Sequence, residues 1–164
     1  MRFSKTLLLA CLALAATGTA ALAAQRGPGR AARPAVGFTV SIAFSPRAAA
    51  EMARRREGLV VSAWWEGTPL RAYRRHAGED GSLSLGSETI NAPGRTGRVV
   101  VTGRGFRADR LAWIERRDAQ VTVNVFSARR SGRDNLLDCG LVAGPFRQIA
   151  GRTHRLRCKL IGEP

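Results

Sequence analysis

The sequence predicts a mainly β protein, an antiparallel β-sandwich of about six to seven strands with one short helix after the first strand and one disulfide. Three observations support this fold class. Short segments alternate apolar and polar residues, turn signals separate these segments, and two cysteines lie outside the N-terminal apolar run. Because side chains alternate along a strand, each such segment can cover a core with one face.

The first 23 residues have the pattern of a secretory signal peptide. A basic start precedes a continuous apolar run, which ends in Ala21-Leu22-Ala23. We therefore expect a signal peptide over residues 1–23, a flexible basic tail over residues 24–35 and a single β-sandwich domain over residues 36–164. No second apolar run of spanning length follows, so we expect no membrane span after cleavage. The expected location is the periplasm or the extracellular space.

Local signals define the first strand and the helix that follows it. Residues 36–44 alternate cleanly, which predicts a half-buried strand. Ser45 can cap a helix with its hydroxyl, and Pro46 suits the first helical turn. We expect this helix to run from Pro46 to about Glu57 and to be closed by Gly58.

The second strand, over residues 59–65, carries two adjacent tryptophans. Because neighbouring residues on a strand face opposite sides, Trp64 and Trp65 must point apart. Large aromatic side chains are usually mostly buried, so the sequence favours burial of both indoles between sheets. The alternative is that Trp64 is exposed and forms an interface with Arg74 and Arg75, since Trp and Arg are enriched at binding hot spots.

Turn clusters divide the rest of the chain into further short strands. Residues 98–102 contain three consecutive valines, and residues 120–126 alternate in the manner of a central strand. A basic loop is expected over residues 128–135, and one helical turn over residues 145–150. The strands expected here are residues 83–90, 98–102 and 120–126, with a short extended segment at 136–141.

The last strand, over residues 152–161, has one apolar and one cationic side. The apolar side carries His154, Leu156, Cys158 and Leu160, and the other side carries Thr153, Arg155, Arg157 and Lys159. Because Cys158 faces the core, we predict a disulfide between Cys139 and Cys158, whereas the third cysteine, Cys11, belongs to the leader. Closing a loop of about 20 residues contributes about 3 kcal/mol, and such bonds form in oxidising compartments.

No residue pattern recommends a catalytic or metal site. His154 and Cys158 share a face, but four residues along a strand span about 13 Å, too far for a nucleophile and its base. No Cys-x-x-Cys or His-x-x-x-His spacing is present, so we expect no metal and no cofactor. The rival expectation is an envelope hydrolase, for which His154, Asp138 and Glu115 are the candidate residues.

The chain is strongly basic. Lysine and arginine number 27 against 12 acidic residues, and removing the leader charges Arg2 and Lys5 from the net charge of +15 leaves +13. Such an excess attracts polyanions. The competing explanation is the codon usage of a GC-rich genome, which favours arginine throughout. We do not expect nucleic acid to be the ligand, because the chain has an export signal and few aromatic residues to stack on bases.

We therefore expect an exported, non-enzymatic binding module that recognises an acidic envelope protein or an envelope polyanion such as an anionic glycan or lipopolysaccharide. A structural accessory protein without a specific ligand is a further alternative. The predicted binding residues are Arg155, Arg157 and Lys159 on the last strand, Arg129, Arg130 and Arg133 on the basic loop, and Trp64, Arg74 and Arg75.

Overall fold

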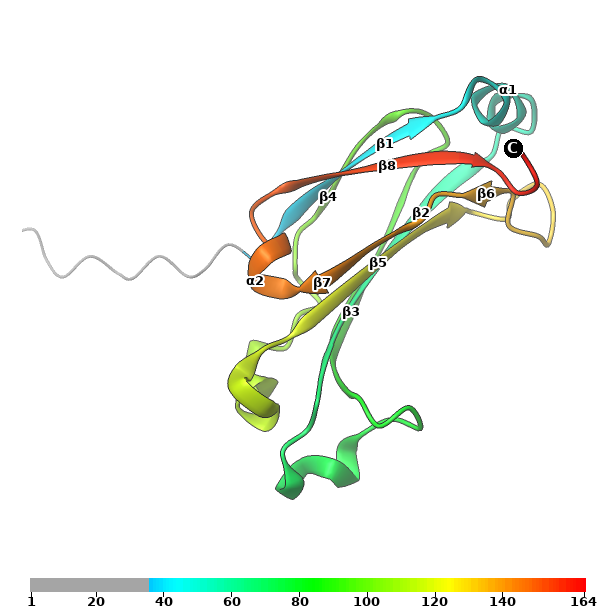
Figure 1. Cartoon of the computed structure of the whole chain (residues 1–164). Helices are drawn as coiled ribbons and strands as arrows, with labels where there is room; N and C mark the ends of the chain where they lie inside the picture. The colour runs from blue at the N-terminus through cyan, green and yellow to red at the C-terminus, as the bar shows by residue number, and fades with distance from the viewer. Residues whose placement is uncertain (1–35) are drawn as a thin grey trace, which may run out of the picture. The chain divides into compact units, whose positions relative to one another are not determined.

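Two four-stranded sheets make up the sandwich (Figure 1). The computed structural model describes residues 36–164, so the expected leader and basic tail, residues 1–35, lie outside the described residues. Sheet A has the strand order β4-β1-β8-β6, and sheet B has the order β3-β2-β5-β7. The strands are β1 (Phe38–Phe44), β2 (Gly58–Gly67), β3 (Leu83–Pro93), β4 (Gly97–Val101), β5 (Gln120–Ser127), β6 (Leu137–Asp138), β7 (Leu141–Pro145) and β8 (Thr153–Leu160). The predicted mainly β fold is confirmed.

Short helices occupy the connections between strands. The first helix, α1, begins as expected, because the Ser45 hydroxyl accepts a hydrogen bond from the Ala48 N–H at 3.0 Å and Pro46 is the first helical residue. Within residues 36–164 no helix is long and apolar enough to cross a bilayer. The helices are α1 (Pro46–Arg54), α2 (Phe146–Ile149) and the 3₁₀ helices η1 (Arg71–His76), η2 (Ala108–Trp113) and η3 (Glu115–Arg117).

The end of α1 differs from the expectation. The helix stops at Arg54 instead of Glu57, and Arg56 takes a left-handed backbone conformation with φ of 50°. Gly58 is the first residue of β2 and plays no part in closing the helix. This early stop lets the Glu57 side chain turn inward, where it is only 5% exposed.

The sandwich has eight strands, more than the six to seven expected. The strand that the sequence does not predict is β7, which contains Gly144 and Pro145, two residue types that disfavour strands. It lies at the edge of sheet B and pairs only with β5, so the missing N–H of Pro145 interrupts no central ladder.

One strand pair is parallel. The first and last strands, β1 and β8, lie side by side in the middle of sheet A, whereas the other strand pairs of the described chain are antiparallel. In this register Ser41 lies beside Arg155, and Ala43 lies beside Arg157. The short side chains of Ser41 and Ala43 therefore lie next to the long cationic side chains of β8, and β4 pairs with the other edge of β1.

The inner faces of both sheets form the core. On β2 the alternation is complete, and Trp65 is fully buried. Its indole packs against the rings of Phe106 and Phe146, with centroids 5.7 and 6.4 Å away. The Trp65 indole thus packs β2 against the segment that follows β4 and against α2. The two sheets share one hydrophobic core.

Candidate functional site

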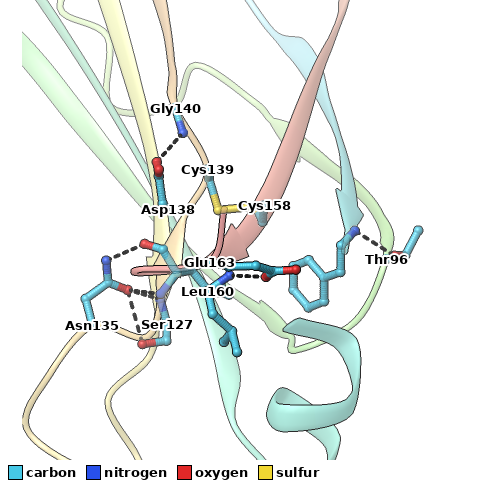
Figure 2. The surroundings of a disulfide bond; sticks show 11 residues. Thr96, Ser127, Asn135, Asp138, Cys139, Gly140, Cys158, Leu160 and Glu163 are labelled. Atoms are coloured by element: carbon cyan, nitrogen blue, oxygen red, sulfur yellow. Dashed lines mark hydrogen bonds between the residues drawn. A yellow bond between two sulfur atoms is a disulfide. The ribbon is translucent and has the colours of Figure 1, made fainter. Parts of the chain in front are cut away.

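The predicted disulfide joins Cys139 to Cys158 (Figure 2). Leu137 and Asp138 of β6 pair with Leu160 and Lys159 of β8, so the cysteines occupy the next position of the same ladder. Both are buried, at 5% and 1% exposure. The bond holds the short strand β6 on β8, and it leaves neither sulfur available as a thiolate.

Four cations share the outer face of sheet A. Arg155, Arg157 and Lys159 project from β8, as predicted, and the sequence reasoning missed a fourth, Arg98 of β4. Ser41 pairs with both Arg98 and Arg155, which places these arginines on either side of it. Neighbouring cations lie about 7 Å apart along β8 and about 10 Å apart across β1. We call Arg98, Arg155, Arg157 and Lys159 the cationic face.

No side chain of the cationic face forms an ion pair in the described chain, although Asp138 lies opposite Lys159 in the strand register. The four ion pairs among residues 36–164 involve arginines at other places, namely Arg54, Arg55, Arg107 and Arg147. The segment before residue 36 contains no aspartate or glutamate, so its side chains offer none either. The charges of Arg98, Arg155 and Arg157 are therefore available to a ligand, whereas Lys159 lies opposite Asp138.

A surface hollow of about 750 Å³ lies at one end of the cationic face. Arg157 and Lys159 line it together with the disulfide and with Asp138, an acidic residue that lies opposite Lys159 in the strand register. The disulfide thus forms part of the hollow that carries two of the predicted binding cations. An anionic group placed here would meet both cations and would also lie near the Asp138 side chain.

Glu163, which follows β8 in the chain, already accepts hydrogen bonds from other groups of the protein. Its carboxylate accepts hydrogen bonds from the Leu160 N–H and the Ser45 hydroxyl, both at 2.8 Å. These bonds, followed by the charges of Arg47 and Lys159, lower the pKa of Glu163. Glu163 therefore stays ionised and anchors the chain end beside α1.

The basic loop, residues 128–135, is held by Glu57. One carboxylate oxygen accepts the N–H groups of Gly58 and Arg130 at 2.9 and 3.1 Å, and the other accepts the N–H and hydroxyl of Ser131 at 2.7 and 2.6 Å. Burial alone would raise the pKa of Glu57, but these four bonds outweigh it and lower the pKa to about 2. Sequence reasoning missed this anchor, because its donors are mostly backbone groups 73 and 74 positions away.

A second anchor closes the same loop at its end (Figure 2). The Asn135 side-chain oxygen accepts hydrogen bonds from the Ser127 and Leu137 N–H groups at 2.9 and 3.1 Å, and its amide donates to the Leu137 carbonyl at 2.7 Å. Arg129, Arg130 and Arg133 are exposed on this loop. The loop leads directly into β6, and the Ile161 N–H donates to the Leu136 carbonyl, so the loop lies beyond the Lys159 end of the cationic face.

The remaining predicted binding residues lie elsewhere. The prediction that both indoles are buried is confirmed for Trp65. It is wrong for Trp64, which is half-buried on the outer face of sheet B. Arg74 and Arg75 are exposed on η1, past the end of β2. The structure thus brings Arg155, Arg157 and Lys159 together but places Trp64 on the outer face of the other sheet.

The candidate hydrolase residues do not converge. His154 is half-buried, its Nε2 atom is 2.9 Å from the Ile149 carbonyl oxygen, and its ring meets the edge of Phe38. Asp138 pairs in register with Lys159, five positions along β8 from His154, or about 17 Å. Glu115 is exposed on η3. Within residues 36–164 no three His, Cys, Asp or Glu side chains form a group that could hold a metal ion.

Comparison with protein-family models, with curated proteins and with solved structures finds no match for this chain.

Proposed function

We propose that the protein is an exported, non-enzymatic binding module whose cationic face holds an extended anionic glycan of the cell envelope, the class to which lipopolysaccharide belongs. The observation that carries this proposal is the row of cations on the outer face of sheet A, none of which forms an ion pair within residues 36–164. The sequence pattern of residues 1–23 supports export to the periplasm or the extracellular space.

The shape of the cationic face favours an extended ligand. Small side chains, Ser41 and Ala43, separate the cations of β4 and β8. They leave a flat strip along which a polymer can lie while its anionic groups meet charges about 7 Å apart. The hollow beside Arg157 and Lys159 gives this strip a defined end.

The distribution of charge also argues against codon usage as the sole cause of the arginine excess. A compositional bias would place arginine on any exposed strand position. The strands of sheet B instead expose serine, threonine, asparagine and glutamine on their outer faces, and none of these strands contains an arginine. Selective placement of arginine on sheet A supports a binding role for it.

The test compares two variants with the same change of net charge. In the full disulfide-bonded chain, Arg155→Ser/Arg157→Ser/Lys159→Ser removes three cations from the cationic face, and Arg71→Ser/Arg74→Ser/Arg75→Ser removes three from η1. Binding to purified lipopolysaccharide is measured by titration calorimetry at low and high salt. At about 1 kcal/mol per cation near an anionic surface, the first variant should bind on the order of 100-fold more weakly.

The second variant should retain most of the affinity. An equal loss in both variants would mean that net charge alone attracts the glycan, and it would overturn the proposed site. Polyglutamate is titrated in parallel, because tighter binding of this acidic polypeptide than of lipopolysaccharide would replace the glycan with an acidic protein as the partner. Binding that does not weaken with salt would contradict an ionic interface.

A further inference from the structure

The outer face of sheet B is polar but almost uncharged. Trp64 lies at its centre, between Ser87 of β3 and Thr122 of β5 in the strand register. The neighbouring row places Ser62 between Thr89 and Asn124. We call Ser62, Trp64, Ser87, Thr89, Thr122 and Asn124 the neutral face. The only charged side chain that β2, β3, β5 and β7 add to this side near Trp64 is Glu66, at the end of the rows.

Trp64 differs from the other two tryptophans in having no ring partner. Trp65 packs in the core against Phe106. Trp113 stacks on Tyr73 with ring centroids 4.9 Å apart, and the guanidinium carbon of Arg110 lies 5.5 Å from the Trp113 ring centroid. Within residues 36–164 the Trp64 indole makes no aromatic pair and meets no arginine. It is half-buried, so part of its ring faces solvent.

The polar groups around Trp64 are also unengaged. In the described part of the chain, the side chains of Ser62, Thr89, Thr122 and Asn124 form no hydrogen bond with another protein group. The loop anchors, by contrast, use the same residue types in closed networks, as Ser127 and Asn135 do. Hydroxyl and amide groups both donate and accept, so these four side chains can match ligand groups of either kind.

We propose that the neutral face binds a neutral polysaccharide. A sugar ring presents C–H groups on one face, which suit the electron-rich face of an indole, and hydroxyls around its rim, which suit the serine, threonine and asparagine side chains. A neutral ligand needs no opposite charge, and its recognition is consistent with sheet-B strands that contain no lysine or arginine in a chain with net charge +15. Arg129 reaches this side only at the end of β5, where its guanidinium lies over the Phe126 ring. The partner is thus defined by ring stacking and hydroxyl recognition, independently of the cationic face.

The test measures retardation of the full disulfide-bonded chain in native gels that contain laminarin, hydroxyethylcellulose or soluble starch. High salt is present throughout to suppress ionic binding by the cationic face. We expect retardation by at least one of these three neutral polymers. Trp64→Ala should weaken this binding by about fivefold, because aromatic stacking contributes roughly 1 kcal/mol beyond area burial. Trp64→Phe, which keeps a ring, should retain most of it.

Trp113→Ala is the matched control, since Trp113 is also half-buried but lies on η2. An equal loss in Trp113→Ala, or no retardation by any of the three polymers, would overturn the proposal. Should Trp64→Ala fail to fold, Thr122→Ala/Asn124→Ala removes the hydrogen-bonding groups and keeps the indole. Unchanged retardation of that double variant would likewise count against the neutral face.

Discussion

The outer faces of the two sheets are both open β surfaces, yet they carry different chemistry. The face of sheet A presents Arg98, Arg155, Arg157 and Lys159, whereas the face of sheet B presents Trp64 among hydroxyl and amide side chains. Both cover the same core. Either composition would keep the protein soluble, so the difference is what we expect if each face has its own ligand, as proposed.

The strand register creates this difference. On β8 every second residue from 153 onward faces outward, and three of the four are cationic. On β2 the outward residues are Val60, Ser62, Trp64 and Glu66. A shift of one residue would exchange inner and outer sets, so the buried face of each strand fixes what the outer face displays.

The largest expected effect tests whether the two sides of β2 differ as described. Trp65→Ala removes a fully buried indole and should lower the free energy of unfolding by about 3–5 kcal/mol. Trp64→Ala removes a half-buried indole on the outer face and should cost much less. Urea denaturation of both variants measures the difference. Similar losses of unfolding free energy in the two variants would mean that Trp64 is a core residue, and would contradict the described difference between the two sides of β2.

The next effect separates sheet A from sheet B. Cys139→Ser/Cys158→Ser removes the bond between β6 and β8 and should cost about 3 kcal/mol. Since the disulfide lines the hollow with Arg157 and Lys159, lipopolysaccharide binding should also weaken, while retardation by neutral polymers should not. Urea denaturation and the two binding assays provide the readouts. Equal loss of both binding activities in the folded variant would show that the faces are not independent.

Local patterns account for the parts of this fold that the sequence predicts. Alternation on β8 is visible in its own residues, as are the opposed directions of Trp64 and Trp65 and the capping of α1 by Ser45. The disulfide also follows, because only two cysteines lie outside the N-terminal apolar run and Cys158 occupies an inward position. These features depend on residues close together in the chain.

Non-local contacts account for what the sequence does not predict. Arg98 joins the cationic face only because β1 pairs with β4 and β8. The glycines of Gly103-Arg104-Gly105 have a packing role that no motif discloses: a Cβ on Gly105 would lie 1.7 Å from the Ser87 carbonyl oxygen. The neutral face is likewise a product of pairing, since its polar residues come from β2, β3 and β5.

The smallest expected effect concerns the basic loop, which connects β5 of sheet B to β6 of sheet A. Glu57 has a pKa of about 2, below its ordinary value of 4.5, so it stabilises the folded state above pH 4.5 and loses this contribution as the pH falls toward 2. Glu57→Gln leaves buried donors poorly matched and should cost about 1–3 kcal/mol at neutral pH. In urea denaturation across this range, the difference between the parent and the variant should shrink with falling pH.

Glu51 provides the control for this prediction, because its pKa is also lowered to about 2, in this case by hydrogen bonds from Arg54 and then Arg55. Its partners are exposed side chains that water can solvate, so Glu51→Gln should change stability far less, and salt should screen the effect. A salt-insensitive loss confined to Glu57→Gln would assign the stabilisation to the buried backbone donors of the loop. Matching, salt-sensitive losses in both variants would instead mean that Glu57 acts only through the surrounding positive charge, and that the loop between the two sheets is not fixed by its hydrogen bonds.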